Sequence, residues 1–365
     1  MSKILILANN DVGLYKFRKE LLIELIKENE VYISLPYGDF IPELEKLGCI
    51  FVNTAISRRG TNPITDLKLL IQYKQIIKEV KPNIVLTYTI KPNVYGGIAC
   101  RLAKVPYIVN VTGLGTAVEN EGVLQKITLF MYRIALKRAS IVFMQNKENE
   151  EFFRRKRITN NNSKLIPGSG VNLQEYSLLE YPPEDNINFL FIARVMKEKG
   201  IEEYIDAAIH IKAKYPQTAF HVLGFCEQDY KNKLNELHDK GIIYYHGMQN
   251  NVRKFHRQSH CTIHPTYYPE GMSNVLLESA ACGRPIITTN RSGCKEVVEN
   301  GINGYIVQEK NSRDLIRKIE EFLNLNFESK KNMGILGRQK VENEFDRNLV
   351  VNSYLKEIKK LEMNG

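Results

Sequence analysis

Apolar segments of strand length alternate with amphipathic segments of helix length along almost the whole chain. This alternation is typical of α/β proteins, in which helices connect the strands of a parallel sheet. Six strands are predicted in each half of the chain, enough for one doubly wound sheet per half: Ile4–Ala8, Val31–Leu35, Ile50–Asn53, Ile84–Tyr88, Tyr107–Val111 and Ile141–Gln145, then Phe189–Ala193, Ala219–Leu223, Ile242–Tyr245, Cys261–His264, Pro285–Thr288 and Gly304–Val307.

The periodic pattern breaks near the middle of the chain. Residues 177–186 combine a proline pair with acidic and polar residues, which predicts a linker and two domains, 1–178 and 179–346. The 365 residues, 43% of them hydrophobic, suffice for two sizeable cores. No apolar run reaches the roughly 20 residues of a membrane span, and the N-terminal segment has the pattern of a buried strand and not of a signal peptide. We therefore expect a cytoplasmic protein, in which six cysteines without a C-x-x-C pair stay reduced.

Two carboxylates, Glu270 and Glu278, frame the segment in which polar side chains are most densely placed. The small and polar residues after Glu270 favour a helix start, and the apolar residues that follow form a helical face, so a helix is predicted to begin near Met272. The unpaired N–H groups and positive dipole of that helix end suit a diphosphate. Glu270 can accept hydrogen bonds from sugar hydroxyls, and Glu278, two turns into the helix, can accept them from a ribose diol. The nucleotide-sugar contacts expected between them come from Gly271, Met272, Ser273 and Asn274.

Two cations follow the first predicted strand of the second half. Arg194 and Lys199 come directly after Phe189–Ala193. In open α/β sheets, ligands bind beyond the carboxyl ends of the strands. Arg194 can hold phosphate oxygens in a fork and Lys199 adds a point charge. Together they predict a site that neutralises a departing nucleoside diphosphate.

These segments resemble the large retaining glycosyltransferase family 4, whose members have the GT-B fold. The resemblance covers nearly the whole chain and is most specific in the second half, where it rests on Arg194-x4-Lys199-Gly200, Glu270-Gly271, Leu277-Glu278-x3-Cys282-Gly-x-Pro285, Gly293-x2-Glu296 and Asn300-Gly-x-Asn-Gly304. The subfamily that the chain most resembles extends lipid-linked oligosaccharides for bacterial capsule, O-antigen or protein glycosylation.

The resemblance implies two Rossmann-like domains that face a central cleft. Residues 1–178 would receive the acceptor, 179–346 would bind the nucleotide sugar, and the last helix, 347–365, would pack on the first domain. The implied reaction moves a sugar, with an N-acetylhexosamine as the leading candidate, from a UDP-sugar to a polyprenyl-diphosphate-linked saccharide with retention of configuration. Arg194, Lys199 and Glu270 would be the catalytic residues.

The first half adds further site candidates. Gly13 follows the first strand and is expected to bring backbone close to the donor. Gly170 resembles a part of the family's element between the domains, and Gly224 a position where the family packs backbone against the nucleotide base. A tight turn or a plain loop is the alternative for the segments of Gly13 and Gly170. The acceptor-binding candidates are Lys16, Arg18, Lys91, Thr112 and Gly113.

The net charge of +10 is concentrated in the first half. Through residue 178 there are 25 Lys and Arg against 16 Asp and Glu. The densest clusters are Arg58–Arg59, Arg133 with Lys137–Arg138, and Arg154–Arg157. The second cluster stands in the apolar segment Leu124–Ala139, which is either a core helix with a solvated basic edge or a helix that lies on an anionic membrane. We expect peripheral association with the inner face of the cell membrane.

Other classes of protein fit less well. The chain has no Trp, no strand that interleaves aromatic with basic residues and no recognition-helix signature, so no nucleic-acid partner is expected. His256, His260 and His264 recur every four residues, but His264 belongs to the predicted strand Cys261–His264, so the three should not share a helix. No metal site is expected, and Arg194 with Lys199 make a metal unnecessary. No other cofactor is expected. A nucleotide-sugar epimerase or hydrolase of the same fold, and a catalytically silent scaffold, remain as alternatives.

Overall fold

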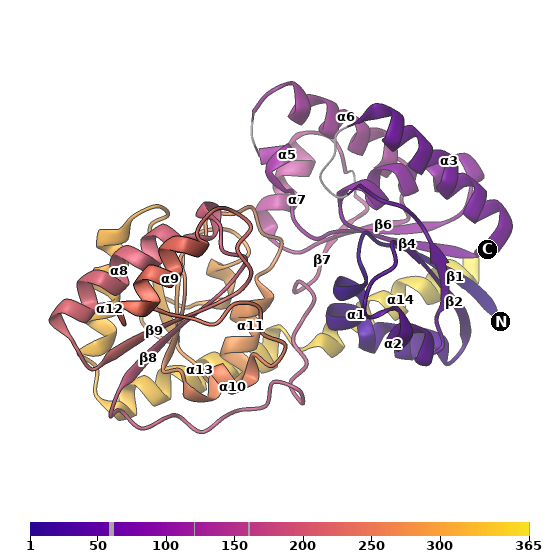
Figure 1. Ribbon diagram of the computed structural model, residues 1–365. Coiled ribbons are helices and arrows are strands. Elements are labelled where there is room, and N and C mark those ends of the chain that lie inside the picture. The colour runs from indigo at the N-terminus through magenta and orange to yellow at the C-terminus, as the bar shows by residue number, and fades with distance from the viewer. Residues whose placement is uncertain (58–61, 120, 160, 365) are drawn as a thin grey trace. The chain divides into compact units, whose positions relative to one another are not determined.

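The chain forms two α/β units in a computed structural model that describes residues 1–57, 62–119, 121–159 and 161–364 (Figure 1). Unit 1 comprises Met1–Gly170 with Arg347–Gly365, and unit 2 comprises Val171–Asp346. The division falls after residue 170, whereas the sequence places it after residue 178. Residues 171–178 belong to unit 2 because their groups bond within it: the backbone oxygen of Tyr176 accepts a hydrogen bond from Arg338, and the Ser177 hydroxyl accepts one from Arg253.

Unit 1 contains a seven-stranded parallel sheet with strand order β3-β2-β1-β4-β5-β6-β7. All six predicted strands are present: β1 Ser2–Leu7, β2 Asn29–Leu35, β3 Ile50–Asn53, β4 Ile84–Tyr88, β5 Tyr107–Val111 and β6 Ile141–Met144. The edge strand β7, Ser163–Leu165, is absent from the prediction. Its Ser-Lys-Leu sequence contains no apolar run that would indicate a strand. Such a run is not needed, because a strand of three residues at the edge of a sheet buries little surface.

Helices cover both faces of this sheet. On one face pack α3 Pro63–Val80, the π-helical turn η1 Pro92–Gly96, α4 Gly97–Ala103, α6 Val123–Leu136 and α7 Lys147–Arg155, and the short α5 Thr116–Glu119 precedes α6. On the other face pack α1 Asp11–Ile26, α2 Ile41–Lys46 and the C-terminal α14 Arg347–Asn364 (Figure 1). Helix α14 is held there by Arg347, whose guanidinium is 3.0 Å from the Glu20 carboxylate of α1.

Unit 2 contains a six-stranded parallel sheet with strand order β10-β9-β8-β11-β12-β13. Its strands are β8 Ile187–Ile192, β9 Thr218–Leu223, β10 Tyr244–Tyr245, β11 Cys261–His264, β12 Ile286–Thr289 and β13 Gly304–Val307. The helical elements are η2 Lys197–Lys199, α8 Ile201–Lys214, α9 Lys231–Asp239, α10 Arg253–Gln258, α11 Asn274–Ala281, η3 Lys295–Val297, α12 Ser312–Leu323 and α13 Phe327–Glu344. The predicted fold class, two doubly wound parallel sheets, is confirmed.

Each sheet reverses its strand order once. In unit 1 the reversal lies between β1 and β4, and in unit 2 it lies between β8 and β11. At such a point the chains leave neighbouring strands in opposite directions, and the crevice between them is where open α/β sheets bind ligands. The loops that follow β1, β4, β8 and β11 are therefore the places where a site is expected.

Four histidines of unit 2 are buried or half-buried, which favours their neutral form. Burial lowers the pKa of His256 and of His264 to about 3, and nearby Arg284 and Lys199 respectively add to the lowering. Burial likewise lowers the pKa of His221 and of His260 to about 4. The three histidines spaced by four residues do not share a helix, because α10 ends at Gln258 and His264 lies in β11. Among the residues that the structure describes, no cluster of His, Cys, Asp or Glu could hold a metal ion.

The buried histidines predict that unit 2 loses stability in mild acid. Below pH 6.5 the unfolded chain binds protons that the folded rings do not, so the free energy of unfolding is complete above that pH and falls as the pH drops toward 4. Each ring contributes at most about 1.4 kcal/mol per pH unit. Urea unfolding between about pH 7 and pH 5 measures the slope. His256→Leu should reduce the slope and Phe255→Leu on the same helix should not; a wild-type stability that is flat over this range would contradict the assignment.

Candidate active site

The reversal in unit 2 gathers the principal charged residues of the predicted site. Arg194 and Lys199 follow β8, and Glu270 follows β11, the strand beside it. Lys199 and Glu270 are 71 residues apart in sequence, yet they form a direct ion pair between Nζ and Oε1. The structure therefore brings the three predicted catalytic side chains to one edge of one sheet.

Both cations have carboxylate partners. The Arg194 Nη1 lies 2.5 Å from Oε2 of Glu227, a residue in the loop after β9. Burial opposes the charge of Arg194, but hydrogen bonds with Glu227 and Tyr268 outweigh it and raise the pKa of this guanidinium. Only 10% of the Lys199 side chain and 18% of the Glu270 side chain are exposed, so this second pair is well shielded from water. Shielding strengthens both the attraction within each pair and the penalty for breaking one.

One aromatic ring lies against both cations. The Tyr268 ring centroid is 5.1 Å from the Arg194 guanidinium carbon and 4.7 Å from the Lys199 Nζ. The negative face of an aromatic ring attracts cations at such distances. Tyr268 stands two residues before Glu270 in the loop after β11, so it fixes the two cations relative to the carboxylate. Neither Tyr268 nor Glu227 is among the site residues predicted from the sequence, and the only signal for Tyr268 is its position two residues before Glu270.

Two glycines of the recognised motifs act through close backbone packing. Gly224 has φ +139°, and a Cβ there would lie 1.8 Å from the carbonyl oxygen of Ala193, so any side chain would displace the loop that carries Arg194. Gly293 has φ +87°, and a Cβ there would lie 2.6 Å from the oxygen of Gly271. Its own carbonyl oxygen accepts a hydrogen bond from Ser273, and its N–H donates to Glu296. The Gly293-x2-Glu296 motif thus supports the loop of Glu270 from behind.

Helix α11 begins at Asn274, two residues after the predicted start near Met272. The bond from Ser273 N–H to Gly293 holds Ser273 in an extended conformation, which delays the helix. Glu278 consequently lies about one turn into the helix and not two. Met272 is buried in the core beneath, so of the predicted donor contacts it offers backbone and not its side chain. The Asn274 Oδ1 is buried and, among the described residues, has no hydrogen-bond partner.

The candidates after β1 of unit 1 differ in accessibility. Gly13 lies inside the first turn of α1, and its N–H donates to the side chain of Asn10, which caps the helix. Lys16 is exposed on the same helix. Arg18 is 5% exposed and its guanidinium carbon lies 5.0 Å from the centre of the Tyr88 ring. The geometry brings Lys16, but not Arg18, to the surface.

The loop after β4 contains one strained residue and is held in place by an ion pair. Thr89 has φ +71°, which is unfavourable for a β-branched residue, and such strain tends to occur at functional positions. Lys91 pairs with Asp66 of α3 at 2.6 Å, and the same carboxylate accepts a hydrogen bond from Tyr95. Thr112 and Gly113 follow the next strand, β5, and are partly exposed. They share the carboxyl edge of the sheet with the loop after β4.

Gly170 closes unit 1 and has φ +64°. Its carbonyl oxygen accepts a hydrogen bond of 3.2 Å from Arg347, the first residue of α14. The next residue, Val171, donates to the oxygen of Phe345. The two places where the chain passes between the units are therefore adjacent.

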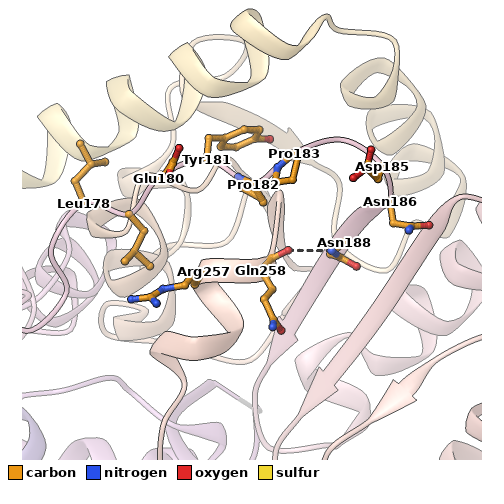
Figure 2. Close-up of a pocket in the computed structure, with 11 residues that line it drawn as sticks. Leu178, Glu180, Tyr181, Pro182, Pro183, Asp185, Asn186, Asn188, Arg257 and Gln258 are labelled. Carbon is orange, nitrogen blue, oxygen red and sulfur yellow. Dashed lines mark hydrogen bonds between the residues drawn. The ribbon is translucent and has the colours of Figure 1, made fainter.

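A hollow of about 700 Å³ lies elsewhere in unit 2 (Figure 2). The linker segment from Leu178 to Asn186 forms one side of it, and Asn188, Arg257 and Gln258 form the other, where the Asn188 amide donates to the Gln258 carbonyl at 3.0 Å. The residues that line it include none of the site candidates. This hollow is separate from the charged edge of the sheet.

Cations and carboxylates at the reversal of a doubly wound sheet define a site for an anionic, hydroxyl-rich ligand such as a nucleotide sugar. Comparison with known protein families supports this interpretation of the site. The family described as "Glycosyl transferases group 1" matches residues 180–340, and that described as "Glycosyl transferase 4-like" matches residues 3–146. The chain belongs to this glycosyltransferase family and is an enzyme of that class. The predictions of family and enzyme class are confirmed.

Named relatives cover most of the chain. It is 26% identical, over 96% of both chains, to the N,N'-diacetylbacillosaminyl-diphospho-undecaprenol alpha-1,3-N-acetylgalactosaminyltransferase of Campylobacter jejuni. It is 23% identical to the Escherichia coli UDP-Gal:alpha-D-GlcNAc-diphosphoundecaprenol alpha-1,3-galactosyltransferase, over 82% of this chain and 80% of the relative. Among solved structures, Anabaena HepE in complex with UDP and glucose superposes with a TM-score of 0.79 at 18% identity, over 99% of this chain and 100% of that one. The superposition confirms the GT-B fold.

Tyr268 offers a test of the geometry. Tyr268→Leu should lower turnover about tenfold, because both cations lose the ring that positions them. Tyr268→Phe keeps the ring face and should retain most of the turnover, although it loses the hydroxyl that bonds Arg194. Steady-state kinetics of both variants, with the UDP affinity measured by calorimetry, make the comparison. Equal losses in both variants would show that the hydroxyl, and not the ring, matters.

Proposed function

We propose that the chain transfers a sugar, with an N-acetylhexosamine as the leading candidate, from a UDP-sugar to a polyprenyl-diphosphate-linked saccharide at the inner face of the cell membrane. The names of the Campylobacter and Escherichia relatives, which act on undecaprenol-diphosphate-linked acceptors, support this choice of acceptor. The UDP and glucose in the HepE complex support the donor class. The product would be an intermediate of a surface polysaccharide or a glycan.

The observation that carries the proposal is the pair of cations at the reversal between β8 and β11. Each cation is neutralised by a carboxylate, Arg194 by Glu227 and Lys199 by Glu270. A nucleoside diphosphate that enters this edge brings the negative charge with which the two cations can pair instead. Glu270, once released from Lys199, can accept hydrogen bonds from the sugar hydroxyls.

We assign the remaining parts of the donor to groups near the two cations. The N-terminus of α11, an eight-residue helix, adds its N–H groups and positive dipole to the diphosphate site. Glu278, one turn in, is assigned to the ribose diol. The backbone at Gly224, packed on Ala193, is assigned to the base.

The chemistry we propose is a displacement on one face of the sugar. The bond from the anomeric carbon to the diphosphate oxygen breaks, a bond to the acceptor hydroxyl oxygen forms on the same face, and the hydroxyl proton passes to a leaving-group oxygen. Arg194 and Lys199 stabilise the charge that develops on the diphosphate. Configuration is retained without an enzyme nucleophile, and the rate comes from positioning and charge stabilisation.

A nucleotide-sugar epimerase or hydrolase is the second candidate, since the same charged edge would serve it. Purified protein incubated with labelled UDP-sugars separates the two. Release of free sugar or of an altered nucleotide without any acceptor indicates the second candidate. Product that forms only with a lipid-linked acceptor supports transfer, and the anomeric coupling constant of that product tests retention.

Removal of the charge of either Arg194 or Lys199 should strongly lower turnover. Arg194→Ala and Lys199→Ala should each lower kcat by roughly 100-fold, about 2.7 kcal/mol, because an electrostatic contact to the leaving group disappears. Lys197→Ala is a matched control, since Lys197 lies in the same turn η2 with 61% of its side chain exposed. Circular dichroism verifies the fold of all three. Near-normal rates in both site variants would refute the assignment.

Metal removal gives an independent test. The proposal assigns the neutralisation of the diphosphate to Arg194 and Lys199, so transfer should proceed at an unchanged rate after exhaustive treatment with EDTA. Restoration of a lost rate by Mg²⁺ or Mn²⁺ would show instead that a divalent cation shares this role.

A further inference from the structure

Two helices of unit 1 present apolar side chains to solvent. On α3, Ile64, Leu67 and Ile71 are 56–68% exposed, and their spacing of three and four residues puts them on one face. On α6, the exposed fractions are 74% for Val123, 45% for Leu124, 55% for Ile127 and 57% for Phe130. Helix α6 also buries Leu129, Tyr132, Ala135 and Leu136 against the sheet, so it is apolar on both sides. We call the seven exposed side chains the α3/α6 surface.

The α3/α6 surface lies on one helical layer of unit 1, toward the carboxyl edge of the sheet. Both helices cover the same face of the sheet, on either side of η1 and α4 (Figure 1). Each helix connects a strand's carboxyl end to the next strand's amino end, so its first half lies near the carboxyl edge. Six of the seven apolar residues fall in these first halves, and Phe130 lies just past the middle of α6. This is the edge that carries Lys16, Lys91, Thr112 and Gly113, the acceptor-binding candidates.

Positive charge flanks the apolar residues. The exposed Lys68, Lys74 and Lys78 share the outer face of α3, and the exposed Lys126 and Arg133 lie beside the apolar residues of α6. Against these five cations, the acidic residues of the two helices are Glu79, which is exposed, and Asp66, which is buried and paired with Lys91. The cluster Arg58–Arg59 lies outside the described residues.

We propose that the α3/α6 surface docks onto an anionic lipid bilayer. Apolar side chains that insert beside lysines and arginines are the combination that binds an interfacial helix to anionic lipids. A second copy of the chain fits less well, because a symmetric dimer through this surface would oppose the same five cations. None of the helices in the described part of the chain is a candidate membrane span.

The docking inference also rests on the proposed function at one point. A polyprenyl-diphosphate-linked saccharide is anchored in the bilayer, and docking by this surface would bring the carboxyl edge of unit 1 close to the acceptor's diphosphate. Without a lipid-linked acceptor the apolar and basic pattern would still predict bilayer binding, but not its purpose.

Vesicle sedimentation of the full chain tests the inference. Wild-type protein should bind vesicles of phosphatidylcholine mixed with phosphatidylglycerol, bind pure phosphatidylcholine less, and dissociate as salt rises. The double variants Ile127→Glu/Phe130→Glu on α6 and Leu67→Glu/Ile71→Glu on α3 should each weaken binding by about tenfold or more. The matched control Ile23→Glu/Leu349→Glu changes exposed residues of α1 and α14, on the opposite layer, and should bind like the wild type.

The outcomes are decisive in either direction. Wild type that ignores anionic vesicles, site variants that bind like the wild type, or a control that loses binding equally would each overturn the inference. So would a wild-type dimer that the site variants convert to monomer in size-exclusion chromatography. Transfer to a short, water-soluble acceptor is measured in parallel: vesicle binding without any transfer upholds docking and rejects the proposed function, whereas transfer without vesicle binding does the reverse.

Discussion

The charged edge of unit 2 depends on the neutralisation of two cations that the fold places at the same end of the sheet. Arg194 and Lys199 lie 5.1 Å and 4.7 Å from the centre of one ring, that of Tyr268, and two like charges that border the same ring repel each other unless they are paired. Glu227 and Glu270 remove the repulsion, and the tyrosine face adds attraction to both. The two carboxylates thus neutralise the cations in the absence of any other anion. Under the proposed function, binding of a diphosphate would be an exchange of anions, which would favour a ligand that brings two negative groups at once.

Backbone packing holds this balance in place. Gly224 packs against Ala193, next to Arg194, and Gly293 packs against Gly271, next to Glu270. In both cases a side chain would collide with a carbonyl oxygen and move a charged residue. The spacing of glycines in the recognised motifs is thus explained by contact between neighbouring loops at one sheet edge. The packing of these two glycines thus helps to determine where the charges lie.

The sequence predicts the parts of this enzyme that depend on local pattern. Twelve of the strands follow from apolar runs, the fold and enzyme class are confirmed, and the Arg194, Lys199 and Glu270 assignments are placed together. What it misses depends on contacts between distant segments: Glu227 reaches Arg194 from 33 residues away, and Gly293 delays the start of α11. The division after Gly170 is missed because residues 171–178 bond to unit 2 through side chains that no local pattern reveals.

The structure divides the cations of the first half into two groups. Arg18 is buried against Tyr88, and Lys91 is paired with Asp66. These cations serve the fold, whereas those of α3 and α6 face solvent beside exposed apolar side chains. The sequence offers α6 as either a core helix or a membrane-facing one, and the two descriptions are compatible, since its buried face builds the core while its outer face remains apolar. A helix that needed only to cover the sheet would gain nothing from exposing Phe130 and Ile127, whereas the proposed docking onto a bilayer would give this second apolar face a partner.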